Sequence, residues 1–163
     1  MTQYNLKLNY AARLIGALAI FTSLSGAAAA DPENNANILE IINTGQMNIL
    51  SIAQSPGAGH SARVTISGRG NGAPTEEFSA TPRWFLPIAP GTIEQTGESQ
   101  FASLEVSGLG NLFAIRQSGG SNHVSGAISG IANQAAVIQA GFNNRAVFTQ
   151  QGTNNFVAIN QSM

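Results

Sequence analysis

The second half of the chain repeats one pattern of apolar and polar residues every eleven positions. Each copy starts with a glycine, has an amide residue three positions later and a mostly apolar residue two positions after that. The glycines are Gly97, Gly108, Gly119, Gly130, Gly141 and Gly152. Apolar side chains then occupy every second position, as in Val157 and Ile159, up to a closing residue such as Gln161. Alternation at period two predicts β-strands.

The segment that begins each copy is typical of a tight turn, because Gly and Asn adopt positive φ at little cost. The amide positions are Gln100, Asn111, Asn122, Asn133, Asn144 and Asn155, and the closing glutamines are Gln117, Gln139, Gln150 and Gln161. Each copy therefore predicts one strand of about five or six residues and one turn. A right-handed helical coil also has an eleven-residue period, but Gly and Asn are poor helix formers.

The same frame is weaker between residues 31 and 73, where Gly45, Asn48 and Gln54 follow it. The frame is absent from residues 74–94. Four copies precede this break and six follow it. We therefore expect degenerate N-terminal repeats over 31–73, an insert over 74–94 and regular C-terminal repeats over 95–163.

A strand buries its apolar face only against another strand, so two successive copies predict one flat coil of about 22 residues. Ten copies give five coils, and the predicted fold class is all-β: a β-solenoid with two strands per coil. Parallel stacking places like residues about 4.7–4.8 Å apart, where amides can bond to one another because they both donate and accept. The expected ladders are Gln117, Gln139 and Gln161 on one side with Gln150 on the other, Asn111 with Asn133 and Asn155, and Asn122 with Asn144.

The insert holds four prolines and the single tryptophan. Proline cannot donate to a strand ladder, so we expect a loop here, between the second and third coils. Trp84 and Phe85 in this loop have two interpretations. They fold against the flank of the solenoid, which we favour, or they form a contact site for a partner or the cell surface.

Residues 1–30 have the layout of a secretory signal peptide. Lys7 and Arg13 precede an apolar stretch from Leu14 to Leu24, and small residues continue to Ala30. The apolar stretch is shorter than the roughly 20 residues of a membrane-spanning helix, which disfavours an N-terminal membrane anchor. We expect cleavage before Asp31, export, and no membrane span in the mature chain.

Charge is scarce, at 9% of the 163 residues with a net charge of −1, against about 25% charged residues in ordinary soluble proteins. This composition excludes the basic footprint of a nucleic-acid-binding protein. Absence of cysteine excludes disulfides and thiolate metal sites. The charges at Glu40, Arg63, Glu105, Arg116 and Arg145 fall on positions predicted to face outward, as expected if alternate positions are buried. Glu77 is an exception.

The sequence contains no recognisable catalytic or cofactor-binding pattern. No nucleophile elbow, P-loop or dinucleotide fingerprint is present. His60 and His123 are the only histidines and lie far apart, and the neighbouring Glu76 and Glu77 would point to opposite faces of a strand. We therefore expect no enzyme activity, no cofactor and no metal site.

Two further interpretations of the repeats are weaker. A disordered low-complexity segment is rich in Asn and Gln, but it does not require the strict register of alternating apolar residues. A calcium-binding β-roll needs acidic oxygen ligands in its turns, and these repeats contain no Asp.

Residues 139–150, QAGFNNRAVFTQ, and 150–161, QQGTNNFVAINQ, resemble the repeat of the curlin family, the secreted subunits of bacterial curli amyloid fibres. The family repeat is Ser-x5-Gln-x-Gly-x2-Asn-x-Ala-x3-Gln. The first segment matches from the Gln onward at every fixed position, and the second has Val157 in the Ala position. The resemblance implies a β-solenoid, secretion through an outer-membrane channel, and assembly into extracellular fibres, with a second curlin-like subunit as partner and roles in adhesion and biofilm matrix.

Both ends of a solenoid expose unpaired strand edges, which soluble proteins normally cover or charge. No charged residue follows Arg145, so the coil at 141–161 is predicted to be a polymerising end. We therefore expect a secreted structural subunit that polymerises with itself into cell-surface fibres. The alternative is a non-polymerising surface adhesin, nucleator or fibre anchor that binds through residues 74–94.

Overall fold

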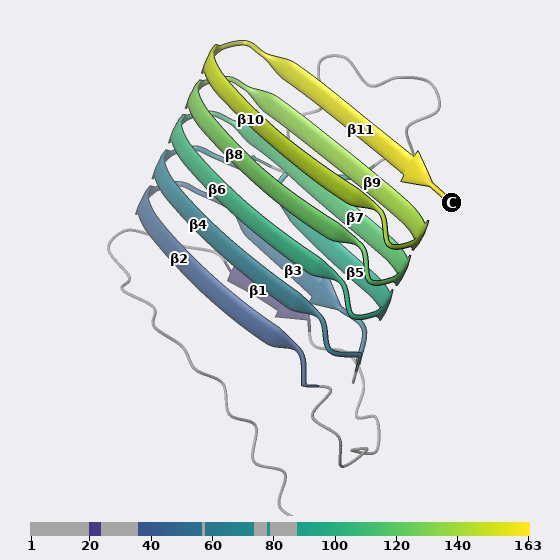
Figure 1. Ribbon diagram of the computed structural model, residues 1–163. Coiled ribbons are helices and arrows are strands. Elements are labelled where there is room, and N and C mark those ends of the chain that lie inside the picture. Colours follow the sequence, from purple (N-terminus) through teal and green to yellow (C-terminus); the bar gives the residue numbers. More distant parts are fainter. Residues whose placement is uncertain (1–19, 24–35, 57, 74–77, 79–87) are drawn as a thin grey trace, which may run out of the picture.

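Alternate strands of the chain form two parallel sheets that face each other (Figure 1). The computed structural model describes residues 20–23, 36–56, 58–73, 78 and 88–163. The strands are β1 (Ile20–Ser23), β2 (Ile38–Gln46), β3 (Leu50–Gln54), β4 (Ser61–Arg69), β5 (Thr92–Glu98), β6 (Phe101–Leu109), β7 (Leu112–Gly120), β8 (His123–Ile131), β9 (Gln134–Phe142), β10 (Arg145–Thr153) and β11 (Phe156–Ser162). The odd sheet has the order β1-β3-β5-β7-β9-β11, and the even sheet has the order β10-β8-β6-β4-β2.

Consecutive strands, from β2 with β3 to β10 with β11, make five coils that stack along one axis (Figure 1). Equivalent residues of neighbouring coils pair in register, at a spacing of about 22 residues in the regular region. Val157 of β11 lies beside Ala135 of β9, which lies beside Phe113 of β7. The prediction of an all-β solenoid of about five coils is confirmed.

The strands are longer than the sequence pattern indicated. Each strand from β6 to β10 has 9 residues, because the strand continues through the repeat glycine at its second-last position. Gly108 of β6, for example, pairs with Gly130 of β8. In a parallel stack the corner of each coil bonds to the corner of the next, so these residues join the ladder instead of forming a separate turn.

The core lies between the two sheets and is built from the inward positions of every strand. Its buried members include Val64, Leu104, Ile115, Val137 and Phe148. Charged residues stay out of this space: Glu40, Arg63, Glu105 and Arg145 are exposed and Arg116 is half-buried. This distribution follows from the high cost of burying an unpaired charge.

The insert interrupts the second coil. β5 begins at Thr92 and pairs with both β3 and β7, so the last residues of the interval 74–94 belong to a strand. Our prediction of a loop between the second and third coils is wrong, because the insert lies within the second coil. Gly68 and Asn71 begin a repeat copy, and the strand of that copy, β5, follows only after the insert. The chain leaves and rejoins the solenoid at one place, since a Cβ on Gly72 would lie 3.1 Å from the Cα of Gly91.

Two described residues of the insert pack on the outer face of the odd sheet. Phe78 and Ile88 are 8% and 7% exposed. They form a second apolar cluster with Leu112, Ala114, Ala136 and Ile138, against which Ala73, Phe156 and Ala158 also pack. The outer face of the odd sheet is thus apolar where the insert covers it.

The short strand β1 lies at the edge of the odd sheet, where Ile20–Ser23 pairs with Leu50–Ala53 of β3. This strand falls within the segment predicted to be a signal peptide, residues 1–30. The ten strands from β2 to β11 all follow that segment. In the full chain the edge of β3 is therefore covered, whereas β2 has β4 as its sole strand neighbour among the described residues.

Candidate functional site: stacked amides and the two end coils

A continuous glutamine ladder runs through the odd sheet. The Nε2 groups of Gln54, Gln95, Gln117 and Gln139 each donate to the Oε1 of the next glutamine, at 2.7–3.0 Å, and Gln161 ends the series. Each Nε2 also donates to a backbone carbonyl of the facing even strand, as Gln139 does to the oxygen of His123 at 3.1 Å. The structure therefore brings Gln117, Gln139 and Gln161 together and leaves their buried amides with partners, as buried polar groups require.

An asparagine ladder follows the corner that leads into the odd sheet. It contains Asn48, Asn71, Asn111, Asn133 and Asn155, and in each step the backbone N–H of one residue donates to the Oδ1 of the asparagine one coil earlier. The side-chain Nδ2 also donates to nearby backbone carbonyls, as that of Asn111 does to Ser107 and Gly130 at 2.9 and 3.1 Å. These bonds tie each corner to the neighbouring coil.

The opposite corner carries a mixed column, which contains Asn37, His60, Gln100, Asn122 and Asn144. Asn144 donates to the Oδ1 of Asn122 from both its backbone N–H and its Nδ2. Gln100 donates its backbone N–H to the Nδ1 of His60 at 3.2 Å. The Nδ1 is therefore an acceptor, so the Nε2 carries the proton that bonds the Oγ of Ser55 at 2.8 Å. Burial lowers the pKa of His60 below 6.5, in agreement with a neutral ring.

The repeat glycines stand where neighbouring coils approach most closely. All six have positive φ, between 95° and 120°. A Cβ on Gly130 would lie 2.0 Å from the carbonyl oxygen of Gly152 in the next coil. Equivalent contacts occur at the other repeat glycines except Gly152, where the nearest atom is the Nδ2 of Asn155 at 3.5 Å. Stacking therefore excludes every side chain at these corners, except at the end of the stack.

Gln150 lies in a different environment from the other closing glutamines. Its column in the even sheet contains Asn43, Ile66, Val106, Ile128 and Gln150. Its Nε2 donates to the carbonyl oxygen of Gln134 at 3.0 Å, but its Oε1 is buried and has no hydrogen-bond partner in the part of the chain that the structure describes. Gln150 therefore belongs to a column that is apolar in the middle and has an amide only at each end.

The two end coils expose more of their inward side chains than the middle coils do. Leu39 and Ile41 of β2 and Val157 and Ile159 of β11 are only partly buried against the core. In the middle coils the equivalent residues are almost fully buried, as Ile93 and Ile115 are at 0% and 1% exposure. Each end of the stack thus exposes both an unpaired strand edge and apolar side chains.

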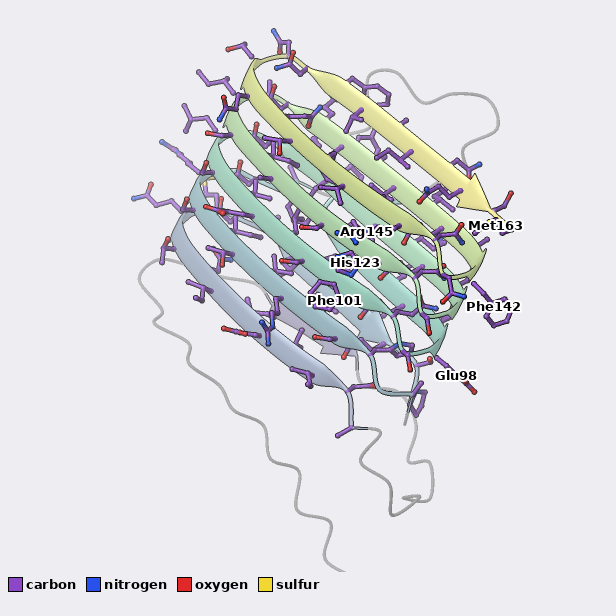
Figure 2. All side chains as sticks on the ribbon, in the orientation of Figure 1. Glu98, Phe101, His123, Phe142, Arg145 and Met163 are labelled. Carbon is purple, nitrogen blue, oxygen red and sulfur yellow. The ribbon has the colours of Figure 1, made fainter. Side chains whose placement is uncertain are left out.

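The outer face of the even sheet carries a column of different chemistry. Phe101, His123 and Arg145 lie one above another (Figure 2). The rings of Phe101 and His123 stack with centroids 4.5 Å apart. Partial burial and the positive charge of Arg145 lower the pKa of His123. Two ion pairs also join neighbouring coils: Arg63 with Glu40 in the even sheet, and Arg116 with Glu94 in the odd sheet.

The described residues hold no cluster of candidate side chains that could bind a metal ion. Trp84, Phe85, Glu76 and Glu77 lie outside the described residues, so the partner contact expected of Trp84 and Phe85 stays a prediction. Within the described ranges no three His, Asp or Glu side chains come together in a way that could hold a metal ion. No helix among the same residues is long and apolar enough to cross a membrane.

The expected glutamine ladder lacked two members, Gln54 and Gln95. Gln95 precedes Gly97 by two positions, which is the spacing of Gln139 and Gly141. That spacing could have identified it as the closing residue of the interrupted copy. The insert hid this relation, because it separates Gln95 from the Gly68 and Asn71 that open the same copy.

These features define a parallel β-solenoid whose coils are joined by amide ladders and whose ends are open. The model of the curlin-associated repeat matches residues 130–162, which span β9, β10 and β11. This C-terminal part of the chain is therefore similar to the curlin-associated repeat. No curated protein and no solved structure shows significant similarity to it.

Proposed function

We propose that this chain is an exported structural subunit that polymerises into a curli-type fibre at the cell surface. The match of residues 130–162 to the curlin-associated repeat supports a structural role. The observation that carries the proposal is the state of the two end coils. Each presents an unpaired even-sheet strand together with partly buried apolar side chains that continue the columns of the interior.

When one copy stacks on the next, the contacts between copies are the same as those between neighbouring coils within the subunit. The apolar side chains of β10 and β11 would be covered by those of β2 and β3, and the backbone groups of the edges would gain partners. Burial of apolar surface favours this addition by about 25 cal/mol for each Å² removed from water. Adhesion and scaffolding of a biofilm matrix are the roles that such a fibre would serve, with no bond-making chemistry in the subunit.

Export and assembly partners are part of the same proposal. The layout of residues 1–30 supports secretion, and the family resemblance supports passage through an outer-membrane channel. A second curlin-like chain is the expected partner that starts or shares the fibre. Its subunits would present the same eleven-residue repeat, because only matching columns continue the ladders.

The test is to purify residues 31–163, which contain β2 to β11, and to incubate them at neutral pH. We expect fibres in electron micrographs, thioflavin fluorescence and cross-β reflections near about 4.7 and 10 Å. Seeds added at the start should remove the lag phase. A folded chain that stays monomeric for days, with and without seeds, would contradict the proposal and favour the non-polymerising adhesin.

A further inference from the structure

The even sheet contains two amides whose buried atoms have no hydrogen-bond partner among the described residues. They are the Nδ2 of Asn43 in β2 and the Oε1 of Gln150 in β10. Both belong to one column, at its two ends, with Ile66, Val106 and Ile128 between them. A buried polar atom without a partner costs free energy, so the subunit alone offers no reason for amides at these positions.

Gln150 is held like a member of the glutamine ladder. Its Nε2 donates to the carbonyl oxygen of the residue sixteen positions earlier, as the Nε2 groups of Gln117, Gln139 and Gln161 do. In Gln117 and Gln139 the second N–H donates to the amide oxygen of the next coil. Gln150 has no next coil within the subunit, so its second N–H is available to whatever stacks on β10.

Asn43 offers the matching acceptor at the other end. Its Oδ1 accepts an N–H from the Nδ2 of Asn48 at 3.2 Å. That Nδ2 also donates to the carbonyl oxygens of Thr44 and Gly68. These two acceptors identify which atom of the Asn48 amide is the nitrogen, and hence which atom of the Asn43 amide is the oxygen that faces it. A carbonyl oxygen has two lone pairs, so this oxygen has one acceptor site left for a donor that stacks on β2.

We infer that Gln150 of one copy donates through its Nε2 to the Oδ1 of Asn43 in the next copy. This inference rests on the proposed function and specifies the contact by which the copies join. The even-sheet column of the fibre would then carry one amide pair per subunit, placed at the junction and nowhere else. The partner is a second copy of this chain, stacked head to tail.

The pair also selects the polarity of stacking. Two C-terminal ends face to face would oppose donor to donor at Gln150, and two N-terminal ends would oppose acceptor to acceptor at Asn43. Head-to-tail stacking alone sets the free N–H of Gln150 against the Oδ1 of Asn43, although the buried Nδ2 of Asn43 and Oε1 of Gln150 take no part in this bond. A contact shifted by two residues along the strand would place Gln150 opposite Ile41 or Gly45 of β2, which leaves its amide without that partner.

The test compares Asn43→Leu, Gln150→Met and the double variant in the 31–163 chain, by the soluble concentration left in equilibrium with fibres. We expect each single variant to raise this concentration about tenfold, because each leaves an amide at the junction unpartnered. The double variant should return to within about threefold of the unmodified chain, since two apolar side chains continue the column of Ile66, Val106 and Ile128. Gln151→Met, on an exposed residue of β10, is the matched control and should change nothing.

Mixing provides a second measurement. An equimolar mixture of the two single variants can alternate, so that every junction is either Gln150 with Asn43 or Met with Leu. We therefore expect the mixture to leave less soluble protein than either variant alone. Thermal unfolding of the soluble variants identifies any loss of folding, which for Gln150→Met would come from the bond to Gln134.

The outcomes separate the inference from the proposed function. If the unmodified chain forms no fibres, the proposed function fails. If it forms fibres but the effects of the two substitutions multiply in the double variant, or neither single variant has an effect, the amide pair is refuted and the proposed function stands.

Discussion

The ring of Phe148 occupies the space beside Gly126 in the preceding coil, where a Cβ on Gly126 would lie 2.3 Å from the Cζ of Phe148. The φ of Gly126 lies outside the left-handed region, so an alanine there has no backbone penalty. We expect Gly126→Ala to destabilise the subunit by about 1–3 kcal/mol, the usual cost of overpacking a core. Urea denaturation of the soluble subunit measures the change.

A second substitution checks the cause. The clash involves only the far ring atoms of Phe148, which leucine lacks. Gly126→Ala should therefore cost much less in a Phe148→Leu background than in the unmodified chain. Equal costs in both backgrounds would show that the ring is not the reason.

The repeat glycines Gly130 and Gly152 form a matched pair, because their φ angles are 120° and 104°. Alanine at Gly130 would place a Cβ 2.0 Å from a backbone oxygen, whereas at Gly152 the nearest atom is 3.5 Å away. We expect Gly130→Ala to destabilise the soluble subunit by about 3 kcal/mol or more, and Gly152→Ala to cost only the strain of its φ, about 1–2 kcal/mol.

Fibre growth should respond differently from subunit stability. In a head-to-tail stack the Cβ of Gly152→Ala would meet the backbone of Gly45 in the next copy, as every other repeat glycine meets its neighbour. This variant should stay folded and fail to elongate seeds of the unmodified chain. Normal elongation by folded Gly152→Ala would be incompatible with such stacking.

The glutamine ladder should be most sensitive in its middle. Gln117 accepts from Gln95 and donates to Gln139, so Gln117→Met leaves buried groups on both sides without that partner. We expect a loss of about 1–3 kcal/mol in the free energy of unfolding. Gln161→Met interrupts one ladder contact and should cost less in the subunit. A larger loss for Gln161→Met in chemical denaturation would contradict this account.

His60 should make the subunit less stable in acid. Protonation at Nδ1 would face the backbone N–H of Gln100, which needs that nitrogen as an acceptor. Because the folded pKa lies below 6.5, the unfolded chain binds the proton more readily. This contribution to stability is present above pH 6.5 and is lost as the pH falls below it.

The measurement is urea denaturation on both sides of pH 6.5. His60→Asn places at this corner the amide that Asn122 and Asn144 supply in later coils, and it should flatten the pH dependence. His123→Asn is the control for the other histidine, whose pKa is also lowered. If the dependence is unchanged in His60→Asn, another group is responsible.

The segment predicted to be cleaved covers one polymerising edge. β1 pairs with β3 along Ile20–Ser23, where β11 of another copy would otherwise add. We expect the full 163-residue chain to elongate seeds more slowly than residues 31–163. Thioflavin kinetics at equal concentrations measure this, and equal rates would show that β1 does not protect the edge.

Much of this architecture could be predicted from the repeat itself. The spacing of Gly130, Asn133 and Gln139 indicates a corner, a stacked amide and an inward closing residue, because each role depends on local backbone chemistry. Placement of the insert could not be predicted in the same way. Whether residues 74–94 separate two coils or divide one depends on which strand Thr92 pairs with, and that pairing is a contact between distant segments.

The sequence by itself determined the fold class, the number of coils and the outward position of the charges, since these follow from period and alternation. The same period indicated that Gln117, Gln139 and Gln161 stack, whereas only the tertiary structure decided that Gln95, beyond the insert, joins them. Gln117 and Gln150 occupy equivalent places in the repeat, but Gln117 stacks on glutamines and Gln150 on Ile128. The reason is that a repeat specifies what each residue can bond, whereas its neighbour 22 residues away decides whether a partner is present.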